Sequence, residues 1–447
     1  MILVKNFVAP AIPLPPPQYD VRQQNEFIRA LRLYFNLLDR YLTQVTDEIN
    51  GNMEPFSATS LDAFGRLRVA NPYTLFDSQN RYQKDPQFSE ALTGSATATY
   101  VANESSVDMA VTTASGDKAV RQTYRVFPYQ PGKSLQVLAT FVMNTGKTNL
   151  RQRVGYFNTD NGVFFQVSGT TNSFVLRTNT SGTPSDARTV NQADWNGDKL
   201  DGTGASGLTL DVSKAQILYM DFEWLGVGSV RCGFIIDGTF IVCHTFNNAN
   251  DIDKVYMTTA ILPVRYEIEN TAATASASTL TQICSSVISE GGYDQKAIPR
   301  WARRTTTLTG VTTTFVPIVS IRLKSTSLGA VVIPSVYHAI PIGSVLDYEV
   351  VLIKNPTLTG ASFTSNSTNV EIDVTATALT GGTIVDLDYV SGSNQGSGVV
   401  STGDSYNFDL QLGASLAGVS DIYTLAARTI SGSDDIIGSM SYYDLTD

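Results

Sequence analysis

The stretch RCGFIIDGTFIVCHT, residues 231–245, carries the pattern that decides the fold. Two runs rich in Val, Ile, Phe and Thr flank Asp237-Gly238, a dipeptide that favours a two-residue turn because both residues tolerate positive φ. The stretch therefore predicts a β-hairpin with strands over residues 231–236 and 239–245.

Around this hairpin, the chain beyond residue 51 keeps alternating apolar and polar residues, with Gly, Asn, Asp or Ser about every 8 to 12 residues. Such spacing is typical of antiparallel β-sandwiches. We predict a mainly β protein with two jelly-roll-like sandwich domains, over residues 52–292 and 305–447, joined by a basic linker over 293–304. A second hairpin is predicted from strands 154–157 and 163–167, joined across Asn161-Gly162. In the second domain, the clearest predicted strands are 348–352, 370–374, 384–389 and 422–427.

The composition limits the partners of this chain. A net charge of −10 over 447 residues disfavours nucleic acid, and no apolar run approaches the ~18 residues of a membrane span. Three cysteines and two histidines without a C-x-x-C pair are too few for a usual zinc site or a disulfide scaffold, and no cofactor is expected. Nearly all of the negative charge lies beyond residue 304, so the basic linker residues Arg300, Arg303 and Arg304 are expected to dock there; a nucleic-acid patch is the alternative.

A helix is predicted over residues 20–51, ahead of the β-domains. Apolar residues recur there at alternating intervals of three and four, which is the a/d spacing of a coiled-coil seam. Because an isolated helix of this length is marginal in water, the seam needs a partner. We expect self-association into a parallel homotrimer, and packing against the chain's own β-domain is the alternative. The seam residues are Ile28, Leu31, Phe35, Leu38, Leu42, Val45 and Ile49.

The segment 1–19 is predicted to be an extended tail. Its prolines favour polyproline II structure, a stiff spacer without internal hydrogen bonds, and the apolar residues before them have no local partner. The tail is either a frayed terminus or an anchoring peptide that adds as a strand to another protein. The anchoring residues are then Ile2, Leu3, Val4, Phe7, Pro15, Pro16 and Pro17.

Two cysteines of the first hairpin are predicted to face each other. With Asp237 and Gly238 as the turn, Cys232 falls opposite Cys243, at a hydrogen-bonded position where Cα atoms lie about 5.5 Å apart. The side-chain direction there is poor for a disulfide. Two reduced thiols packed on one face are therefore favoured, and a disulfide is the alternative.

The loop DWNGDK begins like a calcium-binding loop, because Asp194, Asn196 and Asp198 occupy its ligand positions 1, 3 and 5. The pattern then fails, since Lys199 stands where glycine is required and Ala205 where glutamate is required. We predict no metal site, and interpret the segment as a loop whose Asp and Asn side chains bind their own backbone. A bound cation is the alternative.

Carboxylate pairs and aromatic rings are the remaining chemical candidates. Glycoside hydrolysis needs two carboxylates across a sugar, but polar residues on the solvent face of a sheet produce the same pattern, so we predict no catalytic residues and no enzyme. The pairs are Glu371 and Asp373, Asp386 and Asp388, and Asp434 and Asp435. The rings that can stack on a glycan are Trp195, Tyr442 and Tyr443.

Several segments resemble structural proteins of tailed bacteriophages. LPPPQYD at residues 14–20 and NEFIRALRLYFNLLD at 25–39 are similar to their N-terminal tail and helix, and SLDAFGRLRVANPYTLFDSQNRY at 60–82 to a segment that opens a β-domain. FPYQPGK at 127–133 and WLGVG at 224–228 are similar to parts of that same β-domain. Residues 357–382 and 421–440 resemble the terminal β-unit of virion appendages of marine phages.

The resemblance implies a virion structural protein, a fibre, collar or capsid-attached appendage that assembles in the host cytoplasm, and it brings no catalytic residues. The residues by themselves indicate an anchored tail, an oligomerising helix and two β-domains. We expect a non-enzymatic, homotrimeric virion protein that contacts other virion proteins through its N-terminal tail. A receptor-binding protein for a host-surface glycan is the alternative, and a polysaccharide-degrading enzyme is a third hypothesis that rests only on the carboxylate pairs.

Overall fold

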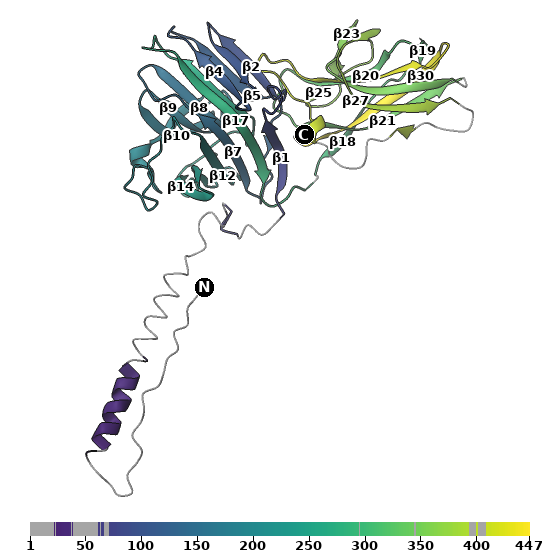
Figure 1. Cartoon of the computed structure of the whole chain (residues 1–447). Coiled ribbons are helices and arrows are strands. Elements are labelled where there is room, and N and C mark those ends of the chain that lie inside the picture. Colours follow the sequence, from purple (N-terminus) through teal and green to yellow (C-terminus); the bar gives the residue numbers. More distant parts are fainter. Residues whose placement is uncertain are drawn as a thin grey trace. The chain divides into compact units, whose positions relative to one another are not determined.

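The computed structural model describes residues 22, 24–36, 38, 61–62, 64–66, 71–294, 296–343, 346–392, 399–400 and 408–447. The chain divides into two units, Met1–Leu61 and Asp62–Asp447. Figure 1 shows that the second unit is built of strands joined by loops, and the predicted mainly β fold is confirmed. Among the described residues, no helix is long and apolar enough to cross a bilayer.

The first unit contains a helix over residues 24–36, and positions 22 and 38 are helical as well. The remainder of the predicted helix lies outside the described residues, and so do Leu42, Val45 and Ile49 of the predicted seam. Ile28, Leu31, Phe35 and Leu38 are the seam residues that the structure places. The whole predicted tail also lies outside the described residues, with Ile2, Leu3, Val4, Phe7, Pro15, Pro16 and Pro17.

The first sandwich of the second unit consists of two antiparallel sheets. Sheet I has the strand order β14-β13-β12-β7-β17-β4-β3, and β1 also pairs with β17. Its strands are β1 (Tyr73–Gln79), β3 (Thr97–Val101), β4 (Ser106–Val111), β7 (Leu135–Val142), β12 (Gln216–Phe222), β13 (Val230–Ile236), β14 (Thr239–Phe246) and β17 (Ser278–Ser289). Sheet II has the order β11-β10-β9-β8-β16-β5-β2. Its strands are β2 (Phe88–Thr93), β5 (Lys118–Thr123), β8 (Leu150–Phe157), β9 (Gly162–Ser168), β10 (Thr171–Thr178), β11 (Ser185–Asn191) and β16 (Val264–Asn270).

The core of this sandwich follows from the two-residue period of a strand, which sends every second side chain inward. Phe165 and Phe174 of sheet II and Phe234 of sheet I are fully buried in one cluster. The ring of Phe165 meets that of Phe234 edge to face, with centroids 5.2 Å apart, a favoured aromatic arrangement.

Both predicted hairpins are present, as β8–β9 and β13–β14. Asp237 and Gly238 adopt positive φ values of 51° and 77°, as a two-residue turn of this kind requires. The predicted pairing of Cys232 with Cys243 is wrong: the register shifts beyond Gly233, and Cys232 pairs with His244. A β-bulge adds one residue to β14 there. Both thiols are free and buried, and burial raises the pKa of each.

The second sandwich again has two antiparallel sheets, and all four strands predicted for it are present. Sheet III has the order β18-β30-β21-β28, and β19 also pairs with β30. Its strands are β18 (Ile298–Arg303), β19 (Leu308–Val311), β21 (Val332–Ile342), β28 (Val399–Val400) and β30 (Asp434–Asp444). Sheet IV has the order β24-β25-β20-β29-β22-β27. Its strands are β20 (Val316–Leu323), β22 (Asp347–Lys354), β24 (Thr364–Ser365), β25 (Val370–Asp373), β27 (Thr383–Ser391) and β29 (Ile422–Thr429).

Short elements complete the description. Two small sheets pair β6 (Phe127–Pro128) with β15 (Ile261–Leu262), and β23 (Thr357–Thr359) with β26 (Ala378–Thr380). Two 3-10 turns, η1 (Gln192–Asp194) and η2 (Phe408–Leu410), lie in connections between strands.

The predicted linker 293–304 is wrong for residues 298–303, because these form strand β18. This strand pairs with β30 and buries Ala302 in the second core. The basic residues lie against the acidic sandwich: Arg300 forms an ion pair with Asp447, and Nη1 of Arg304 donates to the carbonyl of Val374 at 2.8 Å. Pairing with β30 thus makes the basic segment an edge strand of sheet III.

The two sandwiches share a packed boundary. Val331, Ile333 and Phe408, which follow the first sandwich in sequence, belong to the buried cluster of the first sandwich. Nε2 of Gln411 donates to the carbonyl of Val126 at 2.9 Å. Both apolar and polar groups therefore join the two halves of the second unit.

Candidate functional site

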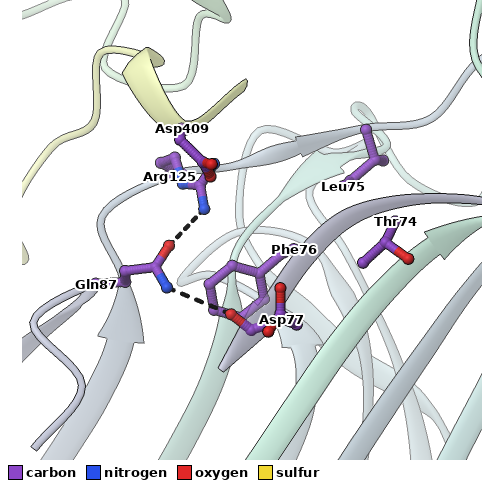
Figure 2. Close-up of a pocket in the computed structure, with 7 residues that line it drawn as sticks. All are labelled: Thr74, Leu75, Phe76, Asp77, Gln87, Arg125 and Asp409. Carbon is purple, nitrogen blue, oxygen red and sulfur yellow. Dashed lines mark hydrogen bonds and ion pairs between the residues drawn. The ribbon is translucent and has the colours of Figure 1, made fainter. Parts of the chain in front are cut away.

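A hollow of about 510 Å³ lies beside this boundary (Figure 2). Strand β1 supplies four of its residues, and single residues come from the segment before β2, the segment after β5 and η2. These residues are Thr74, Leu75, Phe76, Asp77, Gln87, Arg125 and Asp409. The volume falls within the range of small-molecule sites in proteins.

Arg125 is the fixed cation of the hollow. Its side chain is only 7% exposed, and Nη1 donates to the carbonyl of Phe408 at 2.6 Å and lies 3.2 Å from Oδ1 of Asp409. Nη2 donates to Oε1 of Gln87, and the guanidinium lies over the ring of Phe76. Burial lowers the pKa of Arg125, and the charge of Asp409 opposes that shift. Arg125 therefore orders Gln87 and η2 around the hollow.

The rim carries polar groups next to an aromatic cluster. Thr74 and Asp77 are exposed, and the side chain of Asp409 is 82% exposed. The adjacent residue Tyr73 is 36% exposed, and its ring centroid lies 6.0 Å from that of Phe408. Carboxylate and hydroxyl groups beside an accessible ring suit a ligand that has many hydroxyl groups and an apolar face.

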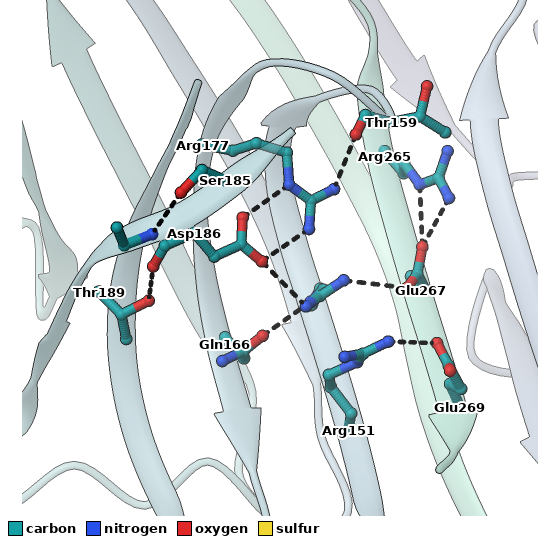
Figure 3. A network of polar contacts seen from close by, with 12 residues as sticks. Arg151, Thr159, Gln166, Arg177, Ser185, Asp186, Thr189, Arg265, Glu267 and Glu269 are labelled. Carbon is teal, nitrogen blue, oxygen red and sulfur yellow. Dashed lines mark hydrogen bonds and ion pairs between the residues drawn. The ribbon is translucent and has the colours of Figure 1, made fainter. Parts of the chain in front are cut away.

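A second polar cluster covers the outer face of sheet II (Figure 3). Arg265 donates to Glu267 with Nη2 at 2.6 Å, and Arg151 donates to Glu269 at 2.8 Å. On the neighbouring strands, Arg177 donates to both carboxylate oxygens of Asp186 at 2.7 and 2.8 Å. We call these residues, together with Lys118 and Arg153, the charged face.

Aromatic rings lie beneath the charged face. Phe157, Phe164 and Val175 form a small cluster that is fully buried, although it lies on the outer side of the sheet. The guanidinium groups of Arg153 and Arg177 cover the ring of Phe164, at 5.2 and 5.1 Å from its centroid. Such contacts let arginines shield apolar area while their charges remain paired.

Glu267 is the central carboxylate of the charged face. Burial opposes its ionisation, but the charges of Arg265, Lys118 and Arg153 outweigh that effect and lower the pKa of Glu267 to about 2. A general acid in glycoside hydrolysis needs a raised pKa. The environment of Glu267 therefore favours a structural role.

The structure corrects two of the three predicted stacking residues. Trp195 is 2% exposed, its indole Nε1 donates to the carbonyl of Val190 at 3.2 Å, and its ring packs against Phe174. Tyr442 is fully buried, and its hydroxyl accepts a hydrogen bond from Nδ2 of Asn366 at 2.7 Å. Neither ring offers a face to a ligand, because each fills a core; Tyr443 is half-buried on β30.

The loop that resembles a calcium site binds its own backbone. Asp198 accepts from the backbone N–H of Leu200 at 2.8 Å and of Ser206 at 2.7 Å, and Asn196 exchanges two hydrogen bonds with the backbone of Thr245. Asp194 is exposed in η1. Within the described parts of the chain, no group of three or more His, Cys, Asp or Glu side chains is placed to hold a metal ion.

The predicted carboxylate pairs also serve the fold. Glu371 forms an ion pair with Arg322 at 2.9 Å, and Asp373 accepts from the backbone N–H of Ser362 at 2.7 Å and of Ala376 at 3.1 Å. Asp435 accepts from the backbone N–H of Gly310 at 3.0 Å. Glu371, Asp373 and Asp435 therefore stabilise strands and turns of the second sandwich.

Sequence reasoning missed both the hollow and the charged face. The hollow joins residues more than 300 positions apart in sequence, such as Phe76 and Asp409, so no local pattern marks it. The charged face had a usable signal, because Arg151 and Arg153, and Glu267 and Glu269, follow the two-residue period of a strand face.

No protein-family model matches the chain, and no curated protein matches it. Among solved structures, it is similar to the carbohydrate recognition domain of Emp47p, at 14% identity and a TM-score of 0.32, over 48% of this chain and 95% of that chain. It is also similar to a β-glucanase of Bacillus licheniformis, at 8% identity and a TM-score of 0.32, over 49% of this chain and 98% of that chain. The chain is also similar to peanut lectin, crystallised with a peptide, at 10% identity and a TM-score of 0.29, over 49% of this chain and 98% of that chain. At these scores the similarities carry no conclusion about what this chain binds.

Proposed function

We propose that this chain is a non-enzymatic structural protein of a tailed-phage virion, a trimeric appendage that is anchored through its N-terminal tail and assembled in the host cytoplasm. The resemblance of its sequence to such proteins supports the virion assignment. One observation about the helix carries the oligomeric part of the proposal.

That observation is the exposure of apolar side chains on the helix of residues 24–36. Ile28 is 40% exposed and Phe35 is 60% exposed, and both belong to the predicted seam. Phe27, which is 39% exposed, lies beside the seam, so that with Tyr34 the apolar arc covers about 120° of the helix at 100° per residue.

An apolar arc of this width is stable only when a partner buries it. Apolar area left in water costs about 25 cal/mol per Å², and a helix of this length is marginal by itself. A three-stranded coiled coil provides a wider apolar interior than a dimer and accommodates aromatic residues such as Phe35. Two further copies of the same chain therefore suit the seam best.

Two measurements test this proposal. We expect the native mass of the full chain, from sedimentation equilibrium over a wide concentration range, to be that of three chains. We also expect gold-labelled antibodies against the chain to bind intact phage particles. A one-chain mass at every concentration would contradict the trimer, and absence of the chain from purified particles would contradict the virion assignment.

A second function, recognition of a host-surface glycan, is favoured by the chemistry of the hollow. Thr74 and Asp77 line the hollow and are exposed, Tyr73 precedes Thr74 on β1 and is 36% exposed, and the buried Arg125 lines the same hollow. Sugar hydroxyls bind carboxylates well, because hydrogen bonds to charged groups contribute about 1.5–3 kcal/mol.

We expect Asp77→Asn to weaken binding of the full chain to its host glycan by about tenfold or more, the equivalent of one such charged hydrogen bond. The measurement is a glycan array followed by titration of the best ligand. Asp253→Asn, which changes an exposed aspartate away from the hollow, is the matched control and keeps full binding. Equal affinities of both variants and the parent chain would exclude the hollow as the site.

A further inference from the structure

Strand β18 carries the most exposed tryptophan of the chain, on the outer face of sheet III. The side chain of Trp301 is 64% exposed, whereas Trp195 is buried and Trp224 is half-buried. Because Ala302 is buried in the second core, the two-residue period of a strand places Trp301 and Arg303 together on the outer face. The indole leaves a large apolar surface in water, so its burial by a ligand is favourable.

The neighbouring strand leaves room beside this ring. In the register of β18 with β30, Trp301 pairs with Ser441 and Arg303 pairs with Ser439. Both serines are half-buried and short, so the residues directly opposite leave the indole uncovered. We call Trp301, Arg303, Ser439 and Ser441 the Trp301 face. It offers a flat apolar ring, two hydroxyl groups and one cation.

Arg303 is an exposed cation without a partner in the described part of the chain. From residue 298 to residue 447, every other Lys and Arg donates a hydrogen bond or forms an ion pair, although acidic residues outnumber basic ones there. The guanidinium of Arg303 is therefore available to an anion from outside, which it can bind with two parallel hydrogen bonds. The partnered cations are Arg300, Arg304, Arg322, Lys324, Lys354 and Arg428.

The acidic character of the second sandwich does not extend to the Trp301 face. The only carboxylate on the outer side of β30 is Asp435, four residues from Ser439, or about 13 Å at the usual rise of a strand. Its Oδ1 accepts from the backbone N–H of Gly310. That separation exceeds the Debye length of about 8 Å at physiological ionic strength. An anionic ligand is therefore attracted by Arg303 with little opposition from β30.

The backbone of β18 disfavours a peptide as the occupant. Pro299 has no N–H to donate, and the carbonyl of Trp301 already accepts from Nδ2 of Asn366 at 3.0 Å. A peptide that extends a sheet as an added strand needs these outward backbone groups. A ligand that uses only the side chains of the face is favoured instead.

We propose that the Trp301 face binds an acidic saccharide, a sugar chain that carries carboxylate groups. One pyranose ring stacks on the indole of Trp301, and its carboxylate accepts hydrogen bonds from the guanidinium of Arg303. The two residues lie about 7 Å apart along the strand, a distance that one uronic acid residue bridges. The hydroxyl groups of Ser439 and Ser441 exchange hydrogen bonds with sugar hydroxyls beside the ring.

This inference rests on the proposed recognition of a glycan and names a class of glycan and a second site for it. No residue of the Trp301 face lines the hollow. The rim of the hollow carries the carboxylates of Asp77 and Asp409, which repel an acidic sugar. The Trp301 face carries the opposite charge, so the two sites select different sugars.

Calorimetric titration of the full chain with tetragalacturonate tests the proposal. The fully methyl-esterified form of the same tetrasaccharide is the matched probe, because it keeps the sugar rings and lacks the charge. We expect the acidic form to bind at least about tenfold more tightly, since hydrogen bonds between charged groups are the stronger ones. Equal affinities for the two forms would overturn the proposal, and so would absence of binding by the acidic form.

Tryptophan fluorescence gives a second readout of the same complex. Trp301 is the only exposed indole of the three, so it dominates quenching of the full chain by acrylamide. A stacked sugar shields the ring, and quenching is expected to fall as tetragalacturonate saturates the chain. Unchanged quenching at saturation would refute stacking on Trp301.

Substitutions separate the two contacts. Arg303→Gln is expected to weaken binding of the acidic form by about tenfold or more and to leave binding of the esterified form unchanged. Trp301→Ala is expected to weaken both forms, and Trp301→Phe to keep most of the affinity because a ring remains. Lys254→Gln and Tyr82→Ala are the matched controls, which remove an exposed cation and an exposed ring elsewhere and keep full binding.

The remaining outcomes identify other occupants. Hexaglutamate that binds as tightly as tetragalacturonate would make the face a site for acidic peptides, and a lower native mass of Trp301→Ala would make it a contact between copies; either result overturns the proposal. Binding that responds to Asp77→Asn but not to Arg303→Gln would refute this inference and keep recognition of a glycan at the hollow. The reverse response would refute the hollow alone, so the two failures are distinguishable.

Discussion

Replacement of Leu31 by aspartate in the full chain is expected to convert the trimer into single chains at micromolar concentration. Leu31 is the second of the seven seam residues, between Ile28 and Phe35, and the substitution places one carboxylate per chain on the trimer axis. Burial of a leucine stabilises by about 1.5–3 kcal/mol in each of three chains, and an unpaired buried charge adds a further cost. The association constant is therefore expected to fall by about a thousandfold or more.

Sedimentation equilibrium of the parent and variant chains measures this effect. Arg29→Asp is the matched control, because it introduces the same side chain at an exposed helix position away from the seam. The control is expected to keep the native mass of the parent chain. A Leu31→Asp chain that keeps the native mass of three chains would contradict the role of the seam in assembly.

The second large effect is expected from Glu267→Ala, which should lower the free energy of unfolding by about 3–5 kcal/mol. Glu267 is buried and balances Arg265, Lys118 and Arg153. Removal of one partner of a buried ion pair leaves charge without compensation, which costs more than the pair contributes when both partners are present. Urea unfolding followed by tryptophan fluorescence at pH 7 measures the change. Glu104→Ala, at an exposed turn position, is expected to change stability by no more than about 0.5 kcal/mol.

The same residue predicts a pH dependence. The pKa of Glu267 is lowered to about 2 in the folded protein, and in the unfolded chain it is near the ordinary value of about 4.3. Its contribution to stability is therefore fully present above that ordinary value and is lost as the pH falls toward 2. Between pH 5 and 3, Glu267→Ala is expected to lose less unfolding free energy than the parent chain. Parallel curves for the two proteins would contradict the assigned ionisation.

The hairpin turns and strand segments could be read directly from the sequence, because they depend on neighbours in the chain. Asp237-Gly238 fixed one turn, and the pairing is as predicted from Ile236 to Gly233. It fails at Cys232, where a bulge in β14 shifts the register by one residue. The bulge accompanies two backbone hydrogen bonds that the loop after η1 makes to β14, from Gly197 to Cys243 and from Asp198 to Val242. No pattern within the hairpin reports that loop.

Residue type alone gave wrong predictions for the exposure of Trp195 and for the structure of the segment around Arg300. Trp195 follows the segment NQAD in what reads as a surface loop. In the fold, however, sheet II supplies Phe174 as a neighbour and Val190 as a hydrogen-bond acceptor, and the ring is buried. The segment with Arg300 had the composition of a linker, yet β30 offered it an unpaired edge. In both cases the deciding partner is distant in sequence.

Local physical chemistry in the sequence thus determined the β-rich character, the turns, the helical residues 24–36 and the difference in charge between a basic segment and an acidic sandwich. Only the tertiary structure decided which side chains enclose the hollow, how arginines cover the rings of sheet II, and which strands remain as sheet edges. Alternation and turn chemistry act over a few residues, whereas burial and ion pairing depend on segments that meet only when the sheets form.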